Sequence, residues 1–524
     1  MSELVTTYKC ADGTKFPVTW LHEGDASLTW GLDNNHWPDP LRPLDAAVWK
    51  GTPARERAFS EAGLPIPTSL RRFLVPHGLV YHQSLELPDE GIDDLVRRCG
   101  GVAAVWEEYC RPGVQRACAR LQAAGDDERI VDLLEVFDYA WAKTMVAAVV
   151  VISAYRRLSE LLAEHFGPEA DTWTATLTQG YSNATVDAAQ AQWELAQIAS
   201  RSAEMRDLIV DGDLSSVQPS LRQVEGGSEF LSAFDDFLLR FGWRSEGWEA
   251  GLPTWREKPE RPLGVIRRMI TDGTASPALA LDEVARRRQE LTSELEDRLR
   301  SDVAKSAEFQ ERLFAVKPYL SVREDRALWQ LNACGSLRSA LLRRGDTMVR
   351  SGSISRAEDI FYLMPEEIEK SGSAHGDLLE LVEERKREWE RWSRLTPPAS
   401  IGAVETSTHP EDMGEAAEGE IRGMAASRGV ATGPARIIRD LSEADRLMPG
   451  DVLVCRTTSP PWTVLFARAS AVVTDAGGVL AHTAITAREY GIPCVVGARG
   501  ATERIRDGMV VTVDGERGVV RLSG

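Results

Sequence analysis

The amino-acid sequence predicts a multidomain protein, with a mainly α-helical region followed by a C-terminal α/β domain. Three observations support this fold class. Apolar residues recur at helical spacing over much of the chain between residues 91 and 395. An acidic run without Lys or Arg then follows Pro397-Pro398. Beyond residue 418, apolar residues gather into short runs bounded by Gly, Pro and Asp-Gly turns, which is the pattern of strands.

Length and composition set limits on the class of protein. The 524 residues are enough for two to four domains, and 43% hydrophobic with 27% charged residues is typical of a soluble globular protein. The net charge of −19 predicts that neither nucleic acid nor an anionic membrane is a partner. The most apolar run, residues 144–155, is shorter than the roughly 20 residues of a membrane span, so it predicts a buried helix.

The cysteines and the N-terminus predict a cytoplasmic protein. The seven cysteines are scattered without a C-x-x-C pair, which favours a reducing compartment and argues against a disulfide framework or a metal site. The first seven residues have neither the basic start nor the apolar core of a signal peptide.

Residues 1–90 are predicted to be mixed and loop-rich. Within them, residues 30–44 carry three prolines in six positions, which exclude a helix interior and fix an extended path. This path holds His36 and Trp37 in place, and we treat both as candidate substrate-binding residues. A packed loop without a binding role explains the same residues.

Residues 91–395 are predicted to form a mainly helical domain. Ile130, Leu133 and Phe137 begin a helical pattern that runs on through residue 162. An i, i+4 stripe from Leu291 through Leu295 and Leu299 to Val303 predicts one charged amphipathic helix. Core packing explains these stripes, and no bound cofactor is predicted from them.

A loop inside the helical region combines cations and carboxylates. Gly and Pro residues between 242 and 259 mark it as a connection between helices. Arg244 and Arg256 are candidates for phosphate contacts, because guanidinium groups bind phosphate in a bidentate manner. Glu246, Glu249 and Glu257 are candidates for a general base acting on a hydroxyl group, and His36 is a rival for that role. A surface network of ion pairs accounts for the loop equally well.

Residues 396–418 are predicted to be a flexible linker. Six acidic residues between 401 and 420, with several Gly, Ser and Thr residues among them, leave too little apolar surface for a packed structure. A coil of this length spans about 26 Å on average and about 70 Å when extended. The linker could therefore carry a small domain between two sites.

Residues 419–524 are predicted to form the α/β domain. The runs that predict strands are 451–455, 471–474, 493–496, 509–513 and 518–522. After the second of these runs, Gly477 and Gly478 predict a tight turn, and a helix opens near His482. A helix N-terminus favours bound phosphate, and an imidazole is a nucleophile, so His482 is predicted to become phosphorylated.

The sequence around His482 resembles the swivelling domain of phosphoenolpyruvate-utilising enzymes, which carry a phosphohistidine. The matching elements are Gly477-Gly478, His482, 487–489, 491–493, 496–497, 423–433 and 450–454. The resemblance covers residues 419–524. It implies that His482 is the catalytic residue and that Gly477, Gly478 and Thr483 form the loop around it.

The arrangement of a phosphoryl carrier and an acceptor domain resembles the phosphohistidine subunit of phenylphosphate synthase and of 4-methylphenyl (p-cresyl) phosphate synthase, and more distantly rifampin phosphotransferase. No Walker A motif precedes the swivelling region, and the 42 residues after His482 cannot form a (β/α)8 barrel of about 250 residues. The resemblance implies that a separate ATP-grasp subunit supplies the phosphoryl group with ATP and Mg²⁺, and that a small aromatic alcohol such as phenol or p-cresol accepts it. Another alcohol or an antibiotic hydroxyl is the alternative acceptor, and a non-catalytic phosphocarrier or regulatory protein is the alternative class.

Overall fold

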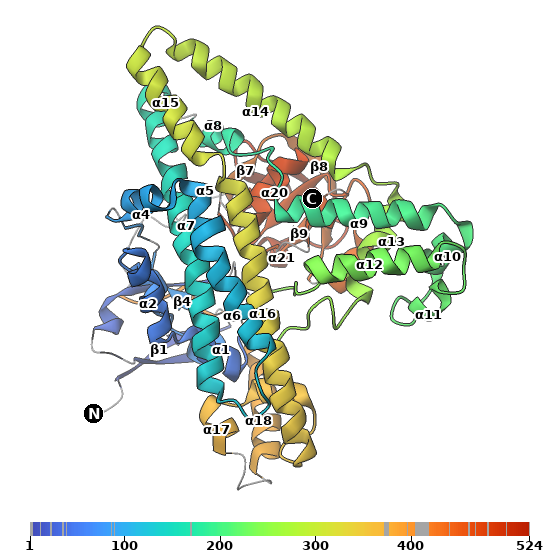
Figure 1. Cartoon of the computed structure of the whole chain (residues 1–524). Coiled ribbons are helices and arrows are strands. Elements are labelled where there is room, and N and C mark those ends of the chain that lie inside the picture. Colours follow the sequence, from blue (N-terminus) through green and yellow to red (C-terminus); the bar gives the residue numbers. More distant parts are fainter. Residues whose placement is uncertain are drawn as a thin grey trace. The chain divides into compact units, whose positions relative to one another are not determined.

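The structure is a computed structural model in which two compact units can be distinguished (Figure 1). It describes residues 4–522 apart from 11, 21, 23, 34–35, 38, 85, 89, 168–169, 371–376, 396, 404–418, 440, 459–461, 467, 479–480 and 499. The first unit consists of residues 1–156, 247–252 and 326–407, and the second unit consists of residues 157–246, 253–325 and 408–524. The region predicted as one helical domain over 91–395 therefore contributes to both units.

The first unit combines helices with two small antiparallel sheets. Its helices are α1 (Pro43–Trp49), α2 (Pro53–Ala62), α3 (Thr68–Arg71), α4 (Ile92–Cys99), α5 (Val102–Ala104), α6 (Arg111–Gln122), α17 (Pro365–Lys370) and α18 (Asp377–Ser393), with parts of α7 (Ile130–Phe166) and α16 (Tyr319–Arg350). Strands β1 (Leu4–Lys9) and β2 (Lys15–Trp20) form a hairpin. Alternate residues of β2 are buried, as expected for a strand with one solvated face.

The second small sheet includes the start of the segment that was predicted to be a linker. It has the order β4-β3-β5, with β3 at Thr29–Leu32, β4 at Tyr81–His82 and β5 at Ser400–Gly402. Ile401 is buried in β5, and the Tyr81 hydroxyl donates a hydrogen bond of 2.8 Å to the carbonyl of Pro398. Residues 397–403 are thus part of the first unit, contrary to the prediction that the linker begins at 396. Most of the predicted linker, 404–418, lies outside the described residues.

Helix α7 contains the apolar run predicted to be a buried helix. The helix is long and apolar enough to cross a membrane by length and composition, but 78% of its most apolar 18-residue window is buried inside the protein. Residues 144–155 are almost all buried or half-buried. The prediction of a core helix is confirmed.

The second unit begins with a set of helices. They are α8 (Ala170–Leu177), α9 (Ala184–Ser200), α10 (Ala203–Asp211), α11 (Gln218–Leu221), α12 (Gly227–Phe241), α13 (Glu260–Asp272), α14 (Pro277–Leu299) and α15 (Val303–Val316). The predicted stripe from Leu291 to Val303 is wrong at its end, because α14 stops at Leu299. Asp302 caps a new helix by accepting the Lys305 backbone N–H, and Val303 is exposed.

The C-terminal part of the second unit is a sheet with the strand order β6-β13-β12-β8-β9-β10-β11-β7. Its strands are β6 (Glu420–Arg422), β7 (Met424–Ser427), β8 (Val430–Ile437), β9 (Val452–Cys455), β10 (Ala471–Thr474), β11 (Cys494–Val496), β12 (Val510–Asp514) and β13 (Val519–Leu522). Strands β8 to β11 run parallel, and the other pairs are antiparallel. The five predicted strand runs are confirmed, and β6, β7 and β8 were not predicted.

Short helices complete this C-terminal domain. They are α19 (Thr463–Phe466), α20 (His482–Tyr490) and α21 (Ala501–Arg504). Helix α20 packs against β7, β10 and β11, and α21 packs against β9 and β10. The fold class predicted from the sequence, a large helical region with a C-terminal α/β domain, is confirmed.

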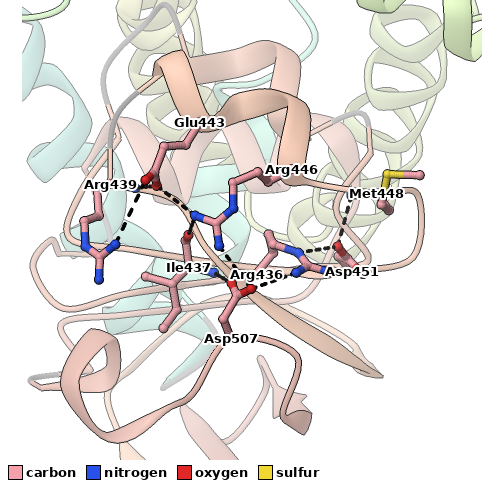
Figure 2. Close-up of polar contacts among 8 residues, drawn as sticks. All are labelled: Arg436, Ile437, Arg439, Glu443, Arg446, Met448, Asp451 and Asp507. Carbon is pink, nitrogen blue, oxygen red and sulfur yellow. Dashed lines mark hydrogen bonds and ion pairs between the residues drawn. The ribbon is translucent and has the colours of Figure 1, made fainter.

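An ion-pair network fixes one edge of this domain (Figure 2). Arg436 on β8 contacts Asp451 through Nε at 3.1 Å and Asp507 through Nη1 at 2.8 Å. Asp507 also accepts the Ile437 backbone N–H at 2.9 Å and contacts Arg446 at 3.0 Å. Partial burial alone would raise the pKa of Asp507, but the Ile437 hydrogen bond and the Arg436 contact hold it below its usual value. The network thus ties β8 to the segments that enter β9 and β12.

Asp451→Ala is expected to lower the stability of the C-terminal domain by about 1–3 kcal/mol, because it removes the buried carboxylate that accepts two hydrogen bonds. Asp451 is buried and accepts both the Met448 backbone N–H at 3.0 Å and Arg436 Nε. Hydrogen exchange of the β8 and β9 amides would measure the loss. Arg517→Ala is the control, because Arg517 is exposed and its contact with Asp514 is weak, at 4.0 Å. Equal protection in both variants would contradict the prediction.

Candidate functional site

The turn between β10 and α20 places His482 at the start of a helix. Gly477 has a φ of 120°, which L side chains rarely adopt, whereas Gly478 does not use the left-handed region. The prediction that both glycines need special backbone angles is therefore right only for Gly477. Helix α20 begins at His482 and ends at Gly491, which caps it in the left-handed conformation as predicted. The backbone thus directs the N-terminal end of the helix dipole to the position of His482.

Thr483 connects the helix start to a neighbouring loop. Its Oγ1 lies 2.7 Å from Oγ1 of Thr458, and both side chains are buried. Thr458 follows β9, so this hydroxyl pair holds the end of that strand against the first turn of α20. Thr483 was predicted as part of the phosphohistidine loop, and its hydroxyl contacts the segment after β9 instead.

Two charged residues that the sequence reasoning missed lie at the same edge of the sheet. Arg456 follows β9 and Asp475 follows β10, and parallel strands bring their carboxyl ends to one edge. The Asp475 carboxylate accepts the Thr502 backbone N–H at 2.9 Å and also its hydroxyl. Burial raises the pKa of Asp475, although the Thr502 hydrogen bonds and the nearby Arg456 act in the other direction. Their position directly after strands is the signal that could have found them.

The two arginines of the predicted loop make structural contacts within the second unit. Arg244 is buried and donates from Nη2 to the carbonyl of Ala184 at 3.0 Å, and burial lowers its pKa to about 10. Arg256 donates to the carbonyls of Leu238 and Leu239 at 3.2 and 3.1 Å. These carbonyls belong to the last turn of α12, so Arg256 caps that helix in the way expected for a C-terminal cation.

The carboxylates of the loop are divided between the two units. Glu246 pairs with Arg261 at 3.0 Å, and Glu257 accepts the backbone N–H and the hydroxyl of Thr254 at 2.9 Å, all within the second unit. Glu249 belongs to the first unit. Glu249 thus falls in a different unit from Arg244, Glu246, Arg256 and Glu257, and a site formed by all five stays a prediction.

The segment 247–252, which contains Glu249, is held within the first unit. Gly251 donates its N–H to Asp45 Oδ1 at 3.1 Å, and its carbonyl accepts hydrogen bonds from Arg42 and from Arg338, the latter at 2.9 Å. Burial raises the pKa of Asp45 to about 6, and burial with the neighbouring Asp45 raises the pKa of Glu249. Two carboxyl groups so placed do not both ionise easily at neutral pH.

His36 lies on the same face of the first unit as this segment. Its ring centroid is 5.5 Å from that of Trp37 and 6.3 Å from that of Trp248. Its Nδ1 is 2.9 Å from Oδ2 of Asp33, and its backbone N–H donates to Oδ1 of Asp33 at 3.0 Å. The structure thus brings His36, Trp37 and the segment carrying Glu249 together, and it adds Asp33 and Trp248, which the sequence reasoning missed.

Metal binding was not predicted from the sequence. Within the described part of the chain, no group of three or more His, Cys, Asp or Glu residues is arranged to hold a metal ion. All seven cysteines are free thiols, and six of them are buried.

Comparison with known proteins identifies the two kinds of domain. Residues 447–518, which include the His482 turn and part of the C-terminal sheet, match the mobile domain of phosphoenolpyruvate-utilising enzymes. Residues 143–324 match the fourth domain of rifampicin phosphotransferase. The first match agrees with the resemblance to phosphoenolpyruvate-utilising enzymes around His482.

Three relatives illustrate how the chain matches longer proteins. Chondramide synthase cmdD of Chondromyces crocatus is 28% identical over 97% of this chain and 14% of that protein. The uncharacterised phosphotransferase YvkC of Bacillus subtilis (strain 168) is 32% identical over 66% of this chain and 42% of that protein. A rifampicin phosphotransferase of Streptomyces sp is 31% identical over 70% of this chain and 43% of that protein. The chain spans less than half the length of each.

Proposed function

We propose that this protein is a phosphotransferase that carries a phosphoryl group on His482 and transfers it to a hydroxyl group. One observation carries the proposal: His482 opens α20 directly after the Gly477 turn, in a domain that matches the mobile domain of phosphoenolpyruvate-utilising enzymes. The helix N-terminus favours the negative charge of a phosphoryl group at this position. Relatives named as phosphotransferases, including rifampicin phosphotransferases, support the same reaction class.

The proposed chemistry makes few demands on the protein beyond positioning. Phosphoryl transfer depends on alignment of the attacking and leaving atoms and on stabilisation of the charge on the phosphoryl oxygens. A phosphohistidine separates the step that consumes ATP from the step that phosphorylates the acceptor. Arg456 at the carboxyl edge of the sheet is a candidate cation for the phosphoryl group on His482, because it follows β9 beside the strand that leads into the glycine turn.

The finer proposal concerns the acceptor. We propose a small aromatic alcohol such as phenol or p-cresol, on the resemblance to aryl phosphate synthase subunits and on the two tryptophan rings beside His36. A larger alcohol, such as the hydroxyl of a rifamycin antibiotic, is the second candidate. The match of residues 143–324 to the fourth domain of rifampicin phosphotransferase favours it.

The donor side of the reaction is proposed to lie on a separate ATP-grasp subunit that binds ATP and Mg²⁺. This proposal rests on the resemblance to two-component aryl phosphate synthases. We place the protein in the cytoplasm, which the free thiols of all seven cysteines support.

The proposal is tested by following a labelled phosphoryl group. The chain is incubated with an ATP-grasp partner and ATP carrying label in its β or γ phosphate. An acid-labile, alkali-stable label on the chain is expected, followed by its release as an aryl phosphate when p-cresol is added. Labelling without release to any alcohol would instead indicate a phosphocarrier. If neither this donor nor a chemical phosphoryl donor labels the chain, the proposal is wrong.

A further inference from the structure

The first unit contains a histidine whose orientation is fixed by a buried carboxylate. Asp33 is only 5% exposed, whereas the His36 side chain is 55% exposed. The Asp33 carboxylate accepts the His36 backbone N–H, which closes a turn over residues 33–36. The same carboxylate contacts Nδ1 of His36, so the ring is held beside this turn. A further hydrogen bond fixes the start of this turn, because the Asp33 backbone N–H donates to the carbonyl of Val80 at 2.8 Å. The contact therefore differs from an ordinary surface ion pair, because Asp33 is buried.

The contacts decide which nitrogen of His36 can accept a proton. A carboxylate accepts hydrogen bonds, so Nδ1 of His36 must carry a proton when it contacts Asp33. The neutral imidazole then has its lone pair on Nε2. Among the described residues, Nε2 of His36 has no hydrogen-bond partner. A buried acid that fixes the tautomer of an exposed histidine is the arrangement by which a carboxylate prepares a histidine base.

Asp33 stays ionised in this arrangement. Burial alone would raise the pKa of Asp33, but interactions with His36 and His82 hold it well below its usual value. His82 completes the cluster from β4, with Nε2 at 3.3 Å from Oδ2 of Asp33. Its Nδ1 lies 2.6 Å from the carbonyl of Gln83, so both ring nitrogens of His82 are occupied. His82 therefore supports the charge of Asp33, and His36 is the histidine of this cluster with a nitrogen available for chemistry.

The surroundings of His36 suit a flat, aromatic molecule. The rings of Trp37 and Trp248 both lie near the His36 ring, and Trp37 is buried whereas Trp248 is half-buried. The backbone carbonyl of Trp248 accepts a hydrogen bond from the thiol of Cys334 on α16 at 3.4 Å. Aromatic rings pair favourably with such side chains at centroid distances of about 4.5–7 Å. A phenol seated here could present its hydroxyl to Nε2 of His36.

We propose that His36 is the general base that takes the proton from an aromatic hydroxyl acceptor, with Asp33 as its positioning residue. The proposal rests on the proposed phosphotransfer from His482. In the step, the hydroxyl proton moves to Nε2 of His36 while the hydroxyl oxygen forms the new P–O bond. The N–P bond breaks and leaves its electron pair on the His482 ring, which takes up one proton from water. His36 then returns its proton to the solvent.

The test separates phosphorylation of His482 from transfer to the acceptor. The full chain is labelled with phosphoramidate, a small chemical phosphoryl donor to histidine, so no partner protein is needed. Transfer is then measured to p-cresol and to 4-nitrophenol in mildly alkaline buffer. An ordinary phenol has a pKa of about 10 and stays protonated there, so it needs a base. The nitrophenol is already mostly ionised and needs none.

His36→Gln is expected to be labelled normally and to transfer to p-cresol about 10²–10⁴-fold more slowly than the wild type. The loss should be much smaller with 4-nitrophenol, which a merely structural role of His36 would not produce. Asp33→Asn should lower kcat for p-cresol with little change in KM and should alter the pH profile of kcat. His22→Gln, another exposed histidine of the same unit, is the matched control and should transfer at the wild-type rate.

Three results would overturn the inference. The first is wild-type transfer to p-cresol by His36→Gln. The second is an equal loss with both phenols, which would assign His36 a structural role. The third is a labelled wild-type chain that transfers to neither phenol, which would exclude an aromatic hydroxyl acceptor and leave the phosphohistidine in place. Failure to label His482 at all would instead contradict the proposed function itself.

Discussion

His482→Ala is expected to abolish acid-labile phosphorylation of the chain completely. The physical reason is that His482 supplies the nucleophilic imidazole at the N-terminus of α20, directly after the Gly477 turn. The measurement is the amount of label retained after incubation with phosphoramidate or with a partner and ATP, before and after mild acid. Because a phosphohistidine is lost in acid and survives in alkali, the stability of the label identifies its chemistry.

Matched substitutions show whether the loss is specific. His165→Ala changes a half-buried histidine in the last turn of α7 in the same unit, and its labelling should remain at the wild-type level. Thermal unfolding of His482→Ala should match that of the wild type, because a helix start of this kind tolerates alanine at its first position. Label that persists in His482→Ala and is lost in another histidine variant would place the phosphoryl group elsewhere.

The part of the fold that the sequence predicted correctly is the part encoded by local patterns. The strands β9, β10, β11, β12 and β13 are short apolar runs between turn residues, so each can be recognised without knowing its partners. Helix α20 has a glycine turn before it and Gly491 after it, and both signals act within a few residues. The candidate site around His482 was predictable for the same reason.

The sequence did not predict how the loop 241–257 would be divided. Arg244 and Arg256 lie in the second unit, where backbone carbonyls occupy their guanidinium groups. Glu249 lies in the first unit, in a segment fixed by Asp45 and Arg338, which are about 200 and 90 positions away in the sequence. Contacts over such separations depend on the tertiary fold, and composition of the loop alone could not reveal them.

Two boundary errors have a common cause. The i, i+4 stripe carried the predicted helix past Leu299, although Asp302 begins a new helix by capping it. The Pro397-Pro398 pair and the acidic run after it placed the start of the predicted linker at 396, although Ser400–Gly402 pairs with β3. In both cases a pattern averaged over many residues concealed a short local signal, and the ends of elements are where such averaging fails.

Breaking the buried ion pair between Arg55 and Asp138 is expected to be the most destabilising single change in the first unit. Both side chains are 1% exposed, and Arg55 Nη2 lies 2.6 Å from Asp138 Oδ1. Arg55 Nη1 also donates to the carbonyl of Leu70 at 3.1 Å, and Asp138 Oδ2 accepts the N–H and the hydroxyl of Thr52 at 2.7 and 2.8 Å. The guanidinium lies 4.5 Å from the centroid of the Trp141 ring. Besides their mutual contact, the two side chains thus also bind backbone groups of Leu70 and Thr52.

Asp138→Leu is expected to lower the free energy of unfolding by about 3–5 kcal/mol, because it leaves the Arg55 charge buried without a counter-charge. Burial already lowers the pKa of Arg55, and the attraction of Asp138 opposes that shift. Urea unfolding followed by tryptophan fluorescence measures the effect, since Trp49 and Trp141 pack against each other beside the pair.

A double-mutant cycle separates the pair from its surroundings. Arg55→Met and Asp138→Leu should each be strongly destabilising, while the double variant should cost less than their sum, because it leaves no unpaired charge. The exposed pair Arg57–Glu135 links the same two helices, α2 and α7, at 3.1 Å with side chains 53% and 42% exposed. The equivalent cycle there should show a coupling of only about 0.2–1 kcal/mol. Equal coupling in the two cycles would mean that burial does not govern the contribution of these ion pairs to the first unit.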